Sequence, residues 1–175
     1  MDHRALIDRL EAFGHALPGV VACVTAEDAR WKPPHGAWSI LEIVCHLEEE
    51  ERRDFRLRLF QTLRDASQPW APNDPEAWAR EGRYHARDLR AMVRAFVAER
   101  AESVTQLRLI TAGRPVDWTI AYQHPKVGPV YAGELLASWA AHDALHLRQI
   151  AKRMFELAGR DAPGFSTRYA GEWGP

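Results

Sequence analysis

The chain has 175 residues, a length that suits one domain and allows most of its apolar surface to be buried without disulfides. Its 23 basic and 24 acidic residues give a net charge of −1 without a basic block, which argues against nucleic-acid binding. No apolar run reaches membrane length and no secretory signal is visible, so with two cysteines we expect a cytoplasmic protein. We expect residues 1–175 to form a single helical domain with an irregular tail from about residue 160.

Four stretches have the apolar periodicity of amphipathic helices, and none has the sustained alternation of a strand. In chain order, the predicted helices run from about Asp2 to Thr25, from Trp38–Ser39 to about Asp65, from about Asp74 to just before Gly113, and from about Gly133 to Leu157. Helices of this length can pack along one another, so the sequence predicts an all-α four-helix bundle.

Proline and glycine mark the expected breaks in these helices. Pro18–Gly19 is expected to kink or break the first helix, and Gly82 is a candidate interruption of the third. The stretch from Thr111 to Ala132 is rich in proline and too long for a plain turn. We therefore expect a long loop before the last helix, held against the bundle by its aromatic residues.

The sharpest chemical motif is a pair of histidines one turn apart in the last helix. His142 and His146 stand at i and i+4, which places their Cβ atoms about 5–6 Å apart on one face. They share a stripe with Leu135, Trp139 and Ile150, so both imidazoles are expected to point into the core. Two hydrogen-bonded core histidines and two ligands of one metal ion both fit this motif.

His46 is the candidate third ligand, because it lies in the middle of the second predicted helix. Glu49, Glu50 and Arg53 share its helical face, which turns apolar again at Leu57. A face that is polar for one or two turns is typical of a site, although a solvated charged surface gives the same pattern. As a site, it would use Glu49 or Glu50 to orient a ligand or act as general base, and Arg53 to hold an anionic substrate group.

Three segments together resemble the DinB-like superfamily. Residues 38–47 (WSILEIVCHL) are similar to the second-helix signature of that family, and residues 142–150 (HDALHLRQI) to its fourth-helix signature. Residues 124–128 (HPKVG), followed by 134–136 (ELL), resemble the lead-in to the fourth helix. The order and spacing of these segments agree with the family from the first helix to about Leu157.

This resemblance implies a bundle with an up-down-down-up chain path and a long crossover between the second and third helices. It implies a three-histidine site at His46, His142 and His146 that binds a divalent metal ion, with nickel or zinc expected, and that stays open to water. It also implies frequent homodimers. Some relatives use the metal to activate low-molecular-weight thiols, and others are regarded as metal-dependent hydrolases.

Two classes of function remain open. One is a metal-dependent enzyme, a thiol S-transferase or a hydrolase, acting on a small thiol or an electrophile. The other is a non-catalytic metal- or small-molecule-binding module of a stress response. A substrate-sized pocket at the metal would favour the enzyme, and a site sealed by Trp118, Tyr122 or Trp139 would favour binding. A zinc protease is disfavoured, because Asp143 stands where such a helix has its glutamate base.

Three further residues are interpreted from their positions. Cys45 projects about 100° away from its neighbour His46 on the helix, so we expect it in the core. Asp143 follows a candidate ligand and is a candidate partner for the metal ligands. His124, in the long loop, is a candidate to reach the site.

Overall fold

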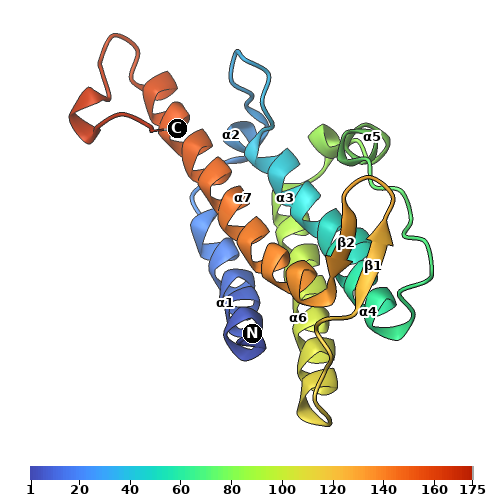
Figure 1. Cartoon of the computed structure of the whole chain (residues 1–175). Helices are drawn as coiled ribbons and strands as arrows, with labels where there is room; N and C mark the ends of the chain where they lie inside the picture. Colours follow the sequence, from blue (N-terminus) through green and yellow to red (C-terminus); the bar gives the residue numbers. More distant parts are fainter. Residues whose placement is uncertain (175) are drawn as a thin grey trace.

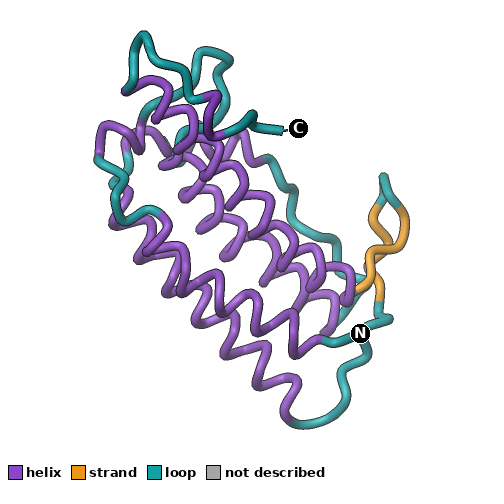
Figure 2. The backbone as a smooth tube through the Cα atoms, turned by 90° about the vertical axis from the view of Figure 1, so that its left-hand side faces the viewer, coloured by secondary structure: helices purple, strands orange, loops and turns teal. Residues whose placement is uncertain are grey.

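The computed structural model describes residues 1–174, and its long helices lie side by side as a bundle (Figures 1 and 2). The bundle helices are α1 (His3–Val20), α3 (Ile40–Glu50) continued by α4 (Arg56–Arg64), α6 (Leu89–Ala112) and α7 (Ala132–Asp161). The shorter elements are α2 (Ala26–Arg30), α5 (Pro75–Glu81), two 3₁₀ turns (Tyr84–Ala86 and Arg168–Ala170) and the strands β1 (Ala121–His124) and β2 (Gly128–Tyr131). Within residues 1–174, no helix has both the length and the apolar character needed to cross a membrane.

The chain path through the bundle is up-down-down-up. In Figure 1, α1 and α7 run upward, whereas the α3–α4 helix and α6 run downward. Because the second and third bundle helices point the same way, the chain has to return along the bundle between them, and residues 65–74 with α5 make that crossover. The predicted all-α four-helix bundle and its chain path are confirmed.

The second bundle helix is continuous from Ile40 to Arg64 but widens in its middle. Ser39 begins it with a capping box: the Ser39 hydroxyl accepts from the Glu42 N–H at 3.2 Å, and the Glu42 carboxylate accepts from the Ser39 N–H at 2.8 Å. Residues 51–55 form a π-helical segment, whose wider turn rotates everything after it about the helix axis. Leu57, expected on the face of His46, is accordingly 49% exposed.

The helix boundaries differ from the prediction in physically simple ways. α1 continues through Pro18 but ends at Val20, directly after Pro18–Gly19 and five residues before its predicted end. Thr25 caps the separate helix α2. The third predicted helix is interrupted at Gly82, as expected, and α7 extends past its predicted end to Asp161.

The segment before α7 is not the loop that the sequence predicts, because it contains a β-hairpin. β1 and β2 pair antiparallel, with Ala121 opposite Tyr131 and His124 opposite Gly128. Strands of four residues are too short for alternation to be recognised in the sequence. The hairpin lies at the end of the bundle that holds the N-terminus (Figure 2).

The apolar core has two parts, and a polar layer separates them halfway along the bundle. One part includes Leu17, Ile40, Val44, Phe96 and Ile150, and the other includes Leu10, Leu59, Leu107, Leu136 and Trp139. Buried charged residues lie between the two parts in the second, third and fourth bundle helices: Glu51, Arg100 and Asp143. The histidines of the candidate site lie at this same level.

Candidate metal centre

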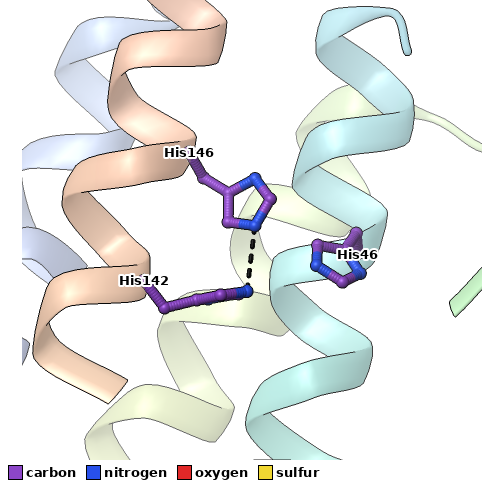
Figure 3. Close-up of side chains that lie close together, drawn as sticks. All are labelled: His46, His142 and His146. Atoms are coloured by element: carbon purple, nitrogen blue, oxygen red, sulfur yellow. Dashed lines mark hydrogen bonds between the residues drawn. The ribbon is translucent and has the colours of Figure 1, made fainter. Parts of the chain in front are cut away.

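His142 and His146 project from the same face of α7 toward α3 (Figure 3). Their Nε2 atoms are 2.9 Å apart, and their ring centroids are 4.2 Å apart. The His46 ring, from α3, has its centroid 5.3 Å from that of His142 and 4.7 Å from that of His146. The three rings therefore meet between two helices, as the sequence predicts.

This cluster fits a divalent metal ion. One nitrogen from each ring can be chosen so that all three lie within 4.8 Å of one another. Three Zn–N bonds of about 2.1 Å in tetrahedral geometry place the nitrogens about 3.4 Å apart, so the most widely separated pair has to approach by roughly 1–1.5 Å for all three to bind one ion. The Nδ1 of His46 is buried without a hydrogen-bond partner, which is unfavourable. An ion held among the rings offers His46 a partner that the described residues do not.

Gln149 selects the tautomer of His146. Its Oε1 lies 2.9 Å from the Nδ1 of His146. Because an amide oxygen only accepts hydrogen bonds, His146 donates through Nδ1 and keeps Nε2 as an acceptor, to which the Nε2–H of His142 then donates. Metal-bound histidines usually have such a partner on the second ring nitrogen.

Burial keeps the three rings neutral. Desolvation, together with the nearby His146, lowers the pKa of His46 to about 3. Desolvation, together with His146, His46 and Arg100, lowers the pKa of His142 to about 2. Burial also lowers the pKa of His146, against the opposing effect of its hydrogen bond to Gln149. The neutral imidazole is the form that binds metal ions.

Aromatic rings lie against the cluster on both sides. The Trp38 ring centroid is 4.9 Å from that of His46, and the Phe55 centroid is 5.0 Å from that of His142. Phe55 in turn stacks on Trp139 at 5.8 Å. Apolar walls of this kind exclude water and strengthen electrostatic interactions within a site.

Two aromatic residues that were considered as seals lie elsewhere. Trp118 stacks on His3 with centroids 5.6 Å apart, and Tyr122 stacks on Trp70 at 4.2 Å. The first stack attaches the segment before α7 to α1, and the second attaches it to the crossover at residues 65–74. The expectation that these aromatic residues pack down is therefore confirmed, but they do not close the histidine cluster.

Of the three predicted catalytic side chains, Glu50 lies next to the cluster. Its Oε1 is 3.7 Å from the Nδ1 of His46, and burial together with neighbouring Asp54 raises the pKa of Glu50 to about 8. Glu49 and Arg53 instead pair with each other, Oε2 to Nη1, at 2.9 Å. The catalytic roles of all three stay predictions.

A buried charge network beside the site was not predicted from the sequence. Arg100 is 2% exposed and donates to both carboxylate oxygens of Asp143 at 2.6 and 2.9 Å, and to Glu51 at 2.9 Å. It also donates to the carbonyl of Leu10 at 2.9 Å. Asp143 is therefore bound to Arg100 on the side of α7 that faces α6, and it is linked to the candidate ligand His142 through the backbone.

Neither Cys45 nor His124 belongs to the histidine cluster. Cys45 is fully buried in the core, as predicted, and burial raises the pKa of its thiol to about 12. His124 belongs to the hairpin, where its Nδ1 accepts from the backbone N–H groups of Lys126 and Val127 at 3.2 and 3.4 Å. It does not belong to the histidine cluster.

Comparisons with known proteins agree with this architecture. No curated protein matches the chain. Among solved structures it is similar to YfiT from Bacillus subtilis, with a TM-score of 0.77 and 17% identity over 89% of this chain and 87% of that one. YfiT is described as a probable metal-dependent hydrolase with an unusual four-helix bundle topology. A sequence model of the DinB superfamily matches residues 9–150, and the chain therefore belongs to the DinB superfamily.

Proposed function

We propose that this chain is a metal-dependent enzyme in which His46, His142 and His146 hold one divalent metal ion. The observation that supports the proposal is the convergence of three neutral imidazoles from two helices, with ligand atoms within 4.8 Å of one another. Three protein ligands leave a coordination position for a substrate, as in catalytic rather than structural zinc sites. Imidazole ligands accept nickel and zinc alike, so metal availability decides between them.

The proposed reaction is hydrolysis, or transfer of a low-molecular-weight thiol to an electrophile. A divalent ion supplies a Lewis acid that polarises a substrate and favours the deprotonated form of water or a thiol. The chain supplies the positioning, because Gln149 holds the tautomer of His146 and Glu50 lies beside His46. The likeness to YfiT, a probable metal-dependent hydrolase, favours hydrolysis.

A non-catalytic metal- or small-molecule-binding module is the second candidate. His46 and His146 are only 5% and 6% exposed, and aromatic rings lie against the cluster, which restricts access. A cavity of about 650 Å³ next to the cluster favours the enzyme, because its volume is that of a small-molecule site.

Elemental analysis of the purified protein beside a His142→Ala variant tests metal binding. We expect about one nickel or zinc ion per chain in the wild type and a strong loss in the variant, because the open site depends on three ligands. His15→Ala is the matched control, since His15 is exposed on α1 and distant from the cluster in sequence. Equal metal content in His142→Ala and the wild type would show that the metal ion is not bound at the proposed site.

Activity screens with the metal-loaded and metal-free protein distinguish the two candidates. Turnover of a thiol–electrophile pair or of an ester or amide, lost in His142→Ala, would support the enzyme. A protein that holds its metal ion but turns over no substrate faster than the metal-free form would favour the binding module.

A further inference from the structure

A cavity of about 650 Å³ lies beside the histidine cluster, lined by the chain before α3, the second half of α7 and the C-terminal tail. Gln149 and Trp38 line this cavity and also contact the cluster. The Gln149 amide accepts from His146 at 2.9 Å, and the Trp38 ring centroid is 4.9 Å from that of His46. The cavity and the histidine cluster therefore share a wall made by Gln149 and Trp38.

Four cationic side chains line this cavity: Lys32, Arg148, Lys152 and Arg153. Glu76 is the acidic residue in the lining. Lys32 is paired with Glu42 at 3.0 Å. Within residues 1–174, no carboxylate lies within ion-pair distance of Arg148 or Lys152, so their charges attract an anion into the cavity.

Arg153 is the buried member of this group, at 4% exposure. Its Nε and Nη1 are buried without a hydrogen-bond partner. The carboxylate of Glu156 is within ion-pair distance, with its Oε2 2.9 Å from the Nη1 of Arg153. That oxygen, however, also makes no hydrogen bond in the described chain. A buried guanidinium with unbonded donors is unfavourable unless another group accepts from it. Because Nε and Nη1 are enclosed, an oxyanion in the cavity contacts the remaining part of the Arg153 guanidinium, which lines the cavity.

We propose that this cavity binds the carboxylate or phosphate group of a small organic anion, with Arg153 as the buried anchor and Arg148 and Lys152 as outer cations. Guanidinium groups bind both oxyanions in bidentate geometry. The inference rests on the proposed function in one respect, which is that the rest of the anion extends past Gln149 to the metal centre as the substrate. It assigns an anionic substrate class to the enzyme.

Calorimetric titration with succinate and with inorganic phosphate tests this site. We expect at least one of them to bind the wild type, and to bind an Arg148→Gln/Lys152→Gln double variant about tenfold or more weakly, because charge-assisted hydrogen bonds are lost. Arg153→Gln should lose anion affinity to a similar extent. If Arg153→Gln fails to fold, the test rests on Arg148→Gln/Lys152→Gln, whose residues are less buried. Binding of succinate alone assigns a carboxylate, and binding of phosphate alone assigns a phosphate.

The matched control is Arg9→Gln/Arg94→Gln, which removes two exposed cations from α1 and α6. It should bind the anion like the wild type. The inference is overturned if neither anion binds at millimolar concentration, if Arg148→Gln/Lys152→Gln binds like the wild type, or if the control loses as much affinity as that variant.

The same titrations on His46→Ala separate this inference from the proposed function. That variant lacks one metal ligand, so anion binding that it retains is due to the cavity. Binding that disappears in His46→Ala, with the fold intact by circular dichroism, would place the anion on the metal ion and overturn the inference alone. A wild-type protein that binds the anion but no metal ion would overturn the proposed function alone.

Discussion

Gln149 is a single polar side chain that connects the histidine cluster to the cavity beside it. Its amide oxygen accepts a hydrogen bond from the Nδ1–H of His146, which leaves the Nε2 of that ring as an acceptor toward His142. A ligand nitrogen held in this way loses less freedom when it binds an ion, and it is more basic. The same side chain lines the cationic cavity, so it contacts both parts of the proposed active site.

We therefore expect Gln149→Ala to bind its metal ion about 10–100-fold more weakly than the wild type, measured by competition with a chromophoric chelator. Gln106→Ala is the control, because Gln106 bonds only to its helix neighbour Glu102 among the described residues. It should retain wild-type affinity. An unchanged affinity in Gln149→Ala would show that this hydrogen bond does not prepare His146 for the metal ion.

The extent to which the site could be predicted depends on how local each pairing is. The spacing of His142 and His146 is a property of one helix, so their proximity follows from the sequence. Joining His46 to them needs the packing of two helices, which the family resemblance supplies. Arg100 was missed although it follows Phe96 by one turn in the apolar stripe of α6, and a charge in such a stripe signals a buried partner.

At the level of elements, the π-helical segment explains why Arg53 is turned away from the histidines. In a regular helix, seven residues make almost two turns, so Arg53 would lie nearly below His46. The wider turn shifts that position along the chain, and Phe55 is the side chain that reaches His142. Nothing in the residue pattern of this segment marks the change, so it could not be predicted.

The contact between α1 and α6 depends on a glycine. A Cβ added at Gly14 would lie 2.9 Å from the Cγ of Arg100, whose guanidinium is held by buried carboxylates. We expect Gly14→Ala to lower the free energy of unfolding by about 1–3 kcal/mol in urea denaturation, because Arg100 has to shift. A Cβ at Gly19, in the same helix, meets nothing within 4 Å, so Gly19→Ala should be neutral or stabilising by up to about 1 kcal/mol. Equal effects of the two substitutions would contradict this prediction.

For the molecule as a whole, the guanidinium of Arg100 is the point at which all four bundle helices meet. It extends from α6 and bonds to Glu51 in the second bundle helix, to Asp143 in α7 and to the carbonyl of Leu10 in α1. This layer separates the two parts of the apolar core. Since a shifted ion pair would leave a buried charge without a partner, the layer also restricts how the helices can slide past one another.

We expect Arg100→Met to lower the free energy of unfolding by about 3–5 kcal/mol, because Glu51 and Asp143 are left buried without a cation. Arg108→Met is the control, since Arg108 is half exposed and its ion pair with Glu11 lies at the surface. That variant should change stability by less than about 1 kcal/mol. Urea denaturation measures both, and similar losses for the two variants would mean that the buried network does not hold the bundle together.

The helices that carry the cluster are translated at different times. His46 leaves the ribosome long before His142 and His146, because α4, α5, α6 and the hairpin lie between them in the chain. A nascent chain without α7 carries one imidazole of the three, and a single imidazole does not hold nickel or zinc firmly. We therefore expect metal binding at the proposed site to follow the docking of α7 on α3, after both helices have been translated.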